Sequence, residues 1–388
     1  MQPGSVRLRQ TLRPHWCRPG TSDRRTTLRR RIALSAVVLA SLLASVAAAS
    51  SAQGAALSAK RPTFVFGINT YLTYSCQTPA QIDQWATTEV HQYKALRANA
   101  IAIAFPLYTA SLTSNTVIAQ ESCTNHTEES PPASIVGDVV NVAHHDGLTV
   151  LLRPLIDQEN LFSQSSTAWR GVLRPTNVNA WFKSYLNTLY PYLQMAQTDR
   201  VEHFAIQSEL DSLADKPNWV TAITKCHSVY GGSLVFDWSW DTGVVKISRA
   251  GTTLALDTYP KVTSPVTATV AQLTAQWNHL LNTRASYKVP RLSRATIDEI
   301  GIPAQDGAYQ QPYKGVLEPM SAHPFNQAIQ VRWFSAACAF MKQHRMKGIY
   351  FWGPWLTSAN GAMLTAPDAN KPSDIQPLAK SAVRRCFN

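Results

Sequence analysis

Eight short apolar segments alternate with helix-like segments from Arg61 to the end of the chain, and this alternation constrains the fold most. The segments have the length and composition of buried strands. They cover residues 64–69, 100–105, 148–153, 201–209, 233–238, 253–257, 294–299 and 348–352. Alternating strands and helices favour a parallel sheet with crossover helices, and a count of eight favours a closed (β/α)8 TIM barrel over an open sheet.

Helix signals between the predicted strands support this fold. Thr78 can cap a helix, Pro79 fits its first position, and Gln81 can complete a capping box. A last helix, over residues 373–386, is predicted to close the wall of the barrel. Because no linker or repeat interrupts the pattern, residues 60–388 are predicted to form one domain.

The first part of the chain differs from the rest and resembles an export leader. Nine arginines and one aspartate precede Ile32, an apolar run then extends to Ala49, and small residues follow. This order is typical of a secretory signal, so residues 1–55 are predicted to be a cleaved leader. The alternative is an uncleaved anchor, since the run approaches the lower length for crossing a bilayer. We therefore expect a secreted, extracellular protein, or one anchored at the outer face of the cell membrane with membrane contact only through the leader.

The positive charge of the chain is concentrated in that leader. Its removal lowers the net charge from +12 to +4. The high isoelectric point therefore does not indicate a nucleic-acid partner, and no zinc-finger spacing or basic-aromatic repeat suggests one. We expect a monomer that binds no nucleic acid.

The cysteines are too widely spaced for a metal cluster. In an exported chain we expect two disulfides with Cys226 free, although the sequence does not fix the connectivity. Cys17 would leave with the leader. The other four lie in pairs, on the loops after the first two strands and on the last two helices: Cys76, Cys123, Cys338 and Cys386.

A metal site or cofactor is not expected. The sequence His144-His145-Asp146 has ligand-type residues, but it lies at a predicted helix end on the side of the barrel opposite the strand ends. No phosphate loop, nucleophile elbow or zinc-protease motif is present.

Two predicted strands run directly into a glutamate, Glu209 and Glu299. The two positions are 90 residues apart (299 − 209), about three units of a barrel that uses roughly 30 residues per unit. The carboxylates would then lie at the ends of the fourth and seventh strands and face each other across the mouth. Paired carboxylates there favour glycoside hydrolysis, with one acid and one nucleophile or base. The alternative is that each is a solvated residue at a strand end, and spacing does not assign their roles.

Aromatic and charged residues near the strand ends could complete a sugar-binding cleft. Sugar rings have apolar faces as well as hydroxyls, so such clefts combine aromatic platforms with hydrogen-bonding groups. The candidates follow strands five, six and eight: Trp238, Trp240, Tyr259, Trp352 and Trp355. Ordinary packing at the barrel rim is the alternative. Arg153, Asp257 and Asp298 also lie at or near strand ends, where each could instead be a structural ion-pair partner.

Several short motifs, in this order and spacing, resemble glycoside hydrolase family 113. They are Leu151-Leu152-Arg153-Pro154, Trp169-Arg170-Gly171, Trp181-Phe182-Lys183-Ser184-Tyr185, Ile206-Gln207-Ser208-Glu209-Leu210, Asp298-Glu299-Ile300-Gly301 and Asn370-Lys371-Pro372-Ser373. The resemblance covers most of the chain from Phe64 onward. It implies a retaining (β/α)8 glycosidase with endo-β-1,4-mannanase activity.

The resemblance also implies roles for individual residues. Glu209 would be the acid/base and Glu299 the nucleophile, while Trp352 would lie under the sugar and Asp257 and Tyr259 would line the cleft. Two neighbours depart from the pattern. Ser208 stands where most members of the clan have asparagine, and Arg153 stands where lysine is expected, which could change how the substrate is recognised.

The sequence thus predicts hydrolysis of a β-linked polysaccharide or oligosaccharide by Glu209 and Glu299, with Arg153, Ser208, Trp238, Asp257, Tyr259, Trp352 and Trp355 as substrate-binding residues. Two alternatives remain: a catalytically silent glycan-binding barrel on the cell surface, and another retaining enzyme of the β-glucosidase or β-mannosidase type.

Overall fold

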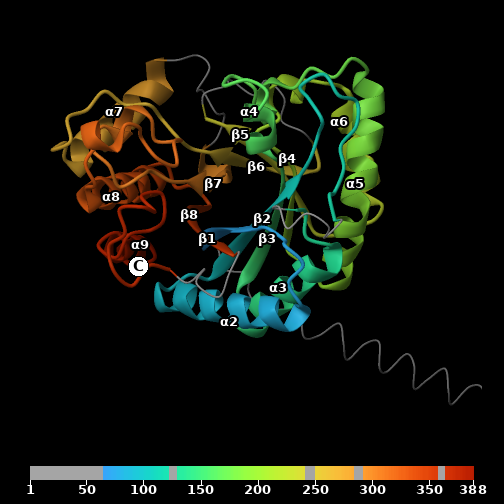
Figure 1. Cartoon of the computed structure of the whole chain (residues 1–388), viewed down its shortest axis with the longest axis horizontal. Helices are drawn as coiled ribbons and strands as arrows, with labels where there is room; N and C mark the ends of the chain where they lie inside the picture. The colour runs from blue at the N-terminus through green and yellow to red at the C-terminus, as the bar shows by residue number, and fades with distance from the viewer. Residues whose placement is uncertain (1–63, 122–128, 241–249, 284–291, 357–362) are drawn as a thin grey trace, which may run out of the picture. The chain divides into compact units, whose positions relative to one another are not determined.

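The computed structural model describes residues 64–121, 129–240, 250–283, 292–356 and 363–388, and these form a closed parallel barrel (Figure 1). The strands follow in chain order: β1 (Val65–Leu72), β2 (Ala100–Leu107), β3 (Thr149–Ile156), β4 (His203–Ser208), β5 (Ser233–Ser239), β6 (Thr252–Asp257), β7 (Thr296–Ile300) and β8 (Gly348–Leu356). The helices between and after them include α2 (Pro79–Ala95), α3 (Ala133–His145), α4 (Gln158–Phe162), α5 (Val178–Thr198), α6 (Asn218–His227), α7 (Val270–Thr283), α8 (Gln327–Gln343) and α9 (Lys380–Cys386). The predicted (β/α)8 TIM barrel is confirmed.

The predicted leader, residues 1–55, lies outside the described residues. Within the described ranges, no helix combines the length and the apolar character needed to cross a membrane.

Each strand presents one set of side chains to the barrel interior and the alternate set to the helices, because side chains of a strand alternate between its faces. In β2 the alanines, such as Ala102, lie in the interior cluster, and the isoleucines Ile101 and Ile103 pack in the outer core. The interior residues are mostly small, which leaves room for a few large side chains. Gly67 of β1 illustrates this, since a Cβ atom there would lie 2.0 Å from the ring of Tyr350.

The start of α2 has the predicted capping box. The backbone N–H of Gln81 donates to the Thr78 hydroxyl at 3.3 Å, and the backbone N–H of Thr78 donates to the Gln81 side chain at 2.9 Å. Two N–H groups at the helix start are thereby satisfied. Aromatic side chains then anchor the outer helices on the barrel, and four tryptophans are fully buried: Trp181, Trp219, Trp277 and Trp333.

The last helix is shorter than the sequence predicts, because α9 begins at Lys380 and not at residue 373. Pro377 interrupts the predicted segment, and proline inside a helix removes a hydrogen bond and clashes with the preceding turn. The buried side chain of Gln376 instead donates to the backbone oxygen of Lys371 at 2.7 Å and fixes a turn.

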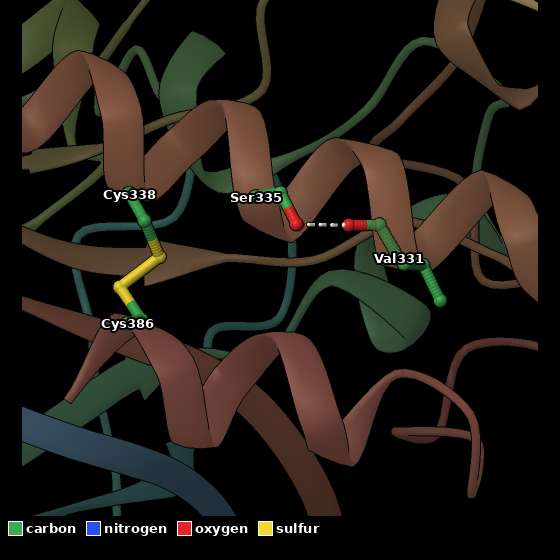
Figure 2. The surroundings of a disulfide bond; sticks show 4 residues. All are labelled: Val331, Ser335, Cys338 and Cys386. Atoms are coloured by element: carbon green, nitrogen blue, oxygen red, sulfur yellow. Dashed lines mark hydrogen bonds between the residues drawn. A yellow bond between two sulfur atoms is a disulfide. The ribbon is translucent and has the colours of Figure 1, made fainter. Parts of the chain in front are cut away.

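A disulfide between Cys338 and Cys386 joins α8 to α9 (Figure 2). Their Cα atoms are 5.5 Å apart, and 48 residues separate them in the chain. Cys226 is a buried free cysteine, as predicted. Cys76 is disulfide-bonded, and Cys123, the other cysteine predicted to pair, lies outside the described residues.

Replacing either Cys338 or Cys386 by alanine is expected to lower the free energy of unfolding by about 2–4 kcal/mol, because the bond restricts a long loop in the unfolded chain. Urea unfolding of both single variants and the double variant measures this. Each single change already removes the whole cross-link, so the double variant should cost little more than either single one. Additive losses from the two single variants would contradict the prediction.

A buried carboxyl on α2 makes stability depend on pH. Glu89 is 2% exposed and accepts hydrogen bonds from Thr70 at 3.0 Å and Tyr93 at 2.5 Å. Burial raises the pKa of Glu89 from an ordinary value of 4.5 to about 8, despite these two hydrogen bonds. The folded state therefore binds a proton more tightly than the unfolded state does.

The free energy of unfolding is accordingly expected to fall as the pH rises from about 5 to about 8. Below the unfolded pKa both states are protonated, and the stabilising proton is lost as the pH passes the folded pKa. Glu89→Gln keeps the acceptor oxygen for Thr70 and Tyr93 but cannot ionise. This variant should have a flatter pH profile in urea unfolding and exceed the wild type in stability at pH 9; a wild-type slope in the variant would refute the assignment.

Candidate active site

The carboxyl ends of the strands surround a cleft of about 560 Å³. Both predicted catalytic residues, Glu209 and Glu299, line this cleft. The other lining residues come from the loops and strand ends after β3, β5, β6 and β7: Phe162, Ser166, Thr167, Trp169, Ser239, Trp240, Asp257, Tyr259, Lys261, Tyr313, Lys314 and Gly315. This is the end of a TIM barrel where active sites lie.

Glu209 follows β4 and has an uncommon backbone conformation, with φ at +54°. Three of the four other non-glycine residues with positive φ in the described ranges, Arg97, Arg200 and Arg345, follow the ends of helices, where a left-handed residue is ordinary. Glu209 instead follows a strand, and its N–H donates to the carbonyl of Asp237 at 3.2 Å. Left-handed geometry in a residue with a long side chain is costly and often occurs at functional sites.

Two side chains hold the carboxyl group of Glu209. Nε of Arg170 donates to its Oε2 at 3.1 Å, and the hydroxyl of Ser239 donates to Oε1 at 3.3 Å. Burial raises the pKa of Glu209, the charge of Arg170 opposes this rise, and the charge of Glu299 adds to it. A carboxyl whose pKa is raised retains its proton at higher pH, as a general acid must.

The position of Arg170 follows from the Trp169-Arg170-Gly171 sequence. A Cβ atom on Gly171 would lie 2.2 Å from the ring of Trp169, so only glycine leaves space for this ring, which lines the cleft. Between them Arg170 turns to the interior, where its Nη1 donates to the carbonyl of Ile156 at 2.7 Å. The guanidinium is thereby fixed beside Glu209.

Glu299 is held by two different donors. The hydroxyl of Tyr259 donates to its Oε1 at 2.6 Å, and Nη1 of Arg153 donates to its Oε2 at 2.7 Å. The backbone also fixes its height in the barrel, because Asp257 of β6 is in register with Glu299 of β7. Two donors to an ionised carboxylate stabilise its charge and fix its orientation.

Arg153 is the centre of a buried charge cluster. Its side chain is fully buried, and its Nη2 donates to Asp237 at 2.7 Å and to Asp257 at 2.6 Å. One guanidinium thus faces three carboxyl groups, including that of Glu299. Burial raises the pKa of Asp237 and of Asp257 well above the ordinary value, and Arg153 opposes this rise. Because a single positive charge cannot balance three buried negative ones, we expect these aspartates to share a retained proton.

Several predicted binding residues lie elsewhere than expected. Arg153 is in the barrel interior beneath Glu299 and is not among the cleft-lining residues. Trp238 packs in the outer core against Phe236, with ring centroids 5.1 Å apart, and it is not among the cleft-lining residues. The reason is its place in β5: Phe236 and Trp238 face the helices, and Asp237 and Ser239 face the interior. Trp240, just beyond the strand, does line the cleft.

The remaining predicted residues divide as follows. Tyr259 and Asp257 line the cleft. The Ser208 side chain is buried, and its hydroxyl has no hydrogen-bond partner among the described residues. Trp352 is half-buried, with its ring 6.0 Å from that of Tyr71. Trp355 has its backbone in β8, but its side chain lies outside the described part of the chain.

Sequence reasoning gave no site role to three residues that contact the two glutamates or their arginine: Arg170, Asp237 and Ser239. The sequence did contain a signal for Asp237 and Ser239 of β5. These polar residues alternate with the apolar Phe236 and Trp238, as residues on the opposite face of a strand do. For Arg170 the sequence contained no such signal beyond its place in the motif Trp169-Arg170-Gly171. This arginine reaches Glu209 across 39 residues of chain, a contact that periodicity does not report.

This arrangement gives two carboxyl groups in one cleft different surroundings. Burial raises the pKa of Glu209, and two side-chain donors hold the carboxyl group of Glu299 in a fixed orientation. Within the described residues, no group of three or more His, Cys, Asp or Glu side chains is placed to hold a metal ion.

Comparisons with known proteins agree with the fold. One solved structure, described as a complex of a GH113 beta-1,4-mannanase, has a TM-score of 0.64 at 16% identity, covering 84% of this chain and 98% of that one. Another, the GH113 beta-mannanase AaManA from Alicyclobacillus acidocaldarius in complex with ManMIm, has a TM-score of 0.63 at 16% identity, covering 84% and 97%. No curated protein sequence matches significantly.

A sequence model of the family described as Glycoside Hydrolase Family 113 matches residues 72–371 of the 388 in the chain. Both glutamates of the cleft fall within this match. Since the match spans well over half of the chain, the protein belongs to glycoside hydrolase family 113.

Proposed function

We propose that this protein is a retaining endo-β-1,4-mannanase in which Glu299 is the nucleophile and Glu209 the acid/base. Glu299 attacks the anomeric carbon while Glu209 protonates the leaving oxygen, and a covalent glycosyl-enzyme forms. Glu209 then removes a proton from water, which attacks the same carbon and releases the sugar.

The observation that carries this proposal is the difference between the environments of the two carboxyl groups. Tyr259 and Arg153 donate to Glu299 at 2.6 and 2.7 Å, which holds its carboxyl oxygens in the fixed orientation that a nucleophile requires. Burial raises the pKa of Glu209, which favours the protonated state that a general acid requires. Both residues line the same cleft.

The choice of mannan rests on the relatives. The two solved structures described above are of a beta-1,4-mannanase and a beta-mannanase. The match to this chain covers nearly the whole length of each of them. Trp169 and Phe162 line the cleft and offer apolar surface for sugar rings.

An activated 2-deoxy-2-fluoro-β-mannoside tests the mechanism directly. The fluorine slows both steps, and the activated leaving group restores the first, so the glycosyl-enzyme should accumulate. We expect intact mass to increase by one sugar and peptide mapping to locate the adduct on Glu299. An adduct on Glu209, or inversion of the anomeric configuration in NMR of early products, would overturn the assignment.

A substrate panel tests the sugar and the mode of cleavage. We expect mannan and glucomannan to be cleaved to mixed oligosaccharides, and cellulose and xylan to be cleaved much more slowly. Release of single sugars from chain ends would indicate the β-mannosidase type instead. Binding without turnover across the panel would support a silent glycan-binding barrel.

We also propose that the chain is exported through its leader, on the strength of the basic and apolar order of residues 1–55. N-terminal sequencing of the protein from culture medium should begin after the apolar run. Recovery of the full-length chain from the membrane fraction would support anchoring.

A further inference from the structure

One wall of the cleft carries two lysines close to an exposed aromatic ring. Nζ of Lys261 lies 4.8 Å from the centre of the Tyr313 ring, and Nζ of Lys314 lies 5.9 Å from it. The ring itself is 49% exposed. All three side chains line the same cleft as the two glutamates.

This wall is fixed to the catalytic residues. Lys261 lies two residues beyond Tyr259, whose hydroxyl donates to Glu299. The next residue, Val262, donates from its backbone N–H to the carbonyl of Tyr309 at 2.9 Å. This bond joins the loop after β6 to the loop after β7, which carries Tyr313.

The loop after β7 is in turn held by buried contacts. The side chain of Gln305 is fully buried, accepts from the N–H of Leu317 at 2.7 Å, and donates to two backbone carbonyls of the loop. Tyr309 is buried and stacks on Trp333, with ring centroids 5.9 Å apart. The position of the aromatic ring with its two ammonium groups is therefore set by the fold.

The two lysines contact the ring of Tyr313. Neither forms an ion pair with any residue in the described ranges, whereas the arginines of the site are both neutralised by carboxylates. A neutral glycan needs no positive charge in its cleft. An apolar ring flanked by ammonium groups combines a platform for a sugar face with partners for an anion.

We propose that Lys261, Tyr313 and Lys314 form a subsite for a sugar that carries a carboxylate, so that the preferred substrate is a β-linked glycan containing uronic acid units. This inference rests on the proposed glycosidase function and specifies its substrate class. The sugar ring lies against Tyr313, and its carboxylate pairs with the two ammonium groups.

Matched pairs of polysaccharides test this subsite. Soluble β-mannan, cellulose and xylan derivatives are each compared before and after partial oxidation of hydroxyl groups to carboxylates. Binding is measured by affinity electrophoresis with Glu299→Gln, and hydrolysis by initial rates with the active protein. We expect the carboxylated member of at least one pair to be preferred, and 1 M NaCl to weaken that preference.

The variant Lys261→Gln/Lys314→Gln should lower the preference roughly three- to tenfold, the range that two exposed ion pairs can supply. The control variant Lys183→Gln/Lys225→Gln removes the same charge from exposed positions on α5 and α6. It should keep the preference for the carboxylated glycan. Tyr313→Ala should weaken binding of both members of a pair.

Two results would overturn the inference: no preference for a carboxylated glycan in any pair, or a preference that persists in the cleft double variant. If the neutral glycan is hydrolysed in either case, the proposed function stands and only the acidic subsite fails. If no glycan is hydrolysed, the proposed function fails, and electrophoresis with and without the lysines still decides whether the subsite exists.

Discussion

Glu299→Gln is expected to lower kcat on the preferred glycan by a factor on the order of 10³ or more, since in the proposed mechanism it removes the oxygen that forms the covalent bond. The amide has nearly the same shape and retains an acceptor oxygen for Tyr259, so the fold should not change. Initial rates and the thermal midpoint, measured on the same preparation, separate these effects. Glu318→Gln makes the same chemical change at an exposed position and should keep the wild-type rate.

Glu209→Ala completes this test, because an acid/base residue fails differently from a nucleophile. With an activated aryl glycoside the first step needs no acid, so a glycosyl-enzyme should still form, and only its hydrolysis should slow by about 10²- to 10⁴-fold. Azide is small and needs no general base, so it should restore turnover and give a glycosyl azide. Azide rescue of the Glu299 variant with retained configuration would reverse the two roles.

Arg153→Gln is expected to have the second large effect, a loss of about 3–5 kcal/mol in the free energy of unfolding together with most of the activity. The substitution removes the one positive charge shared by the buried carboxyl groups of Asp237, Asp257 and Glu299. Breaking a buried pair by removing one partner leaves the remaining charges without compensation. Urea unfolding at pH 7 measures the loss of stability.

Two further variants separate charge from shape in this cluster. Arg153→Lys keeps the charge but cannot donate to three carboxyl groups with a planar fork, so an intermediate loss is expected. Asp237→Asn resembles the protonated state favoured by burial, so it should be much less harmful than Arg153→Gln. If Asp237→Asn and Arg153→Gln were equally destabilising, the shared proton inferred for the aspartates would be wrong.

The alternation of side chains along β5 explains why Trp238 lies away from the cleft. Its sequence position suggested a cleft residue, but side chains of β5 alternate between the helices and the interior, and Asp237 and Ser239 occupy the interior positions. The alternation was already present in the sequence. What was missing was the register that tells which set faces inward, and that is fixed only when β5 pairs with its neighbours.

The last helix shows a second kind of difference. Its predicted start at residue 373 lies seven residues before the observed start at Lys380. The side chain of Gln376 competes there for backbone carbonyls and forms a turn. Whether a side chain forms such a bond depends on which backbone carbonyls lie within hydrogen-bond distance in the folded chain. A pattern of apolar residues does not predict this.

The sequence by itself determined the barrel, its order of strands and the two glutamates at the ends of β4 and β7, because these depend on local apolar periodicity and on counting units along the chain. Only the tertiary structure decided what surrounds each glutamate. Arg170 meets Glu209 and Arg153 meets Glu299 from strands and loops distant in sequence, at 3.1 and 2.7 Å. The physical reason is that charge and burial act through space: the pKa of a carboxyl depends on groups within a few ångströms, and closure of the barrel brings those groups together.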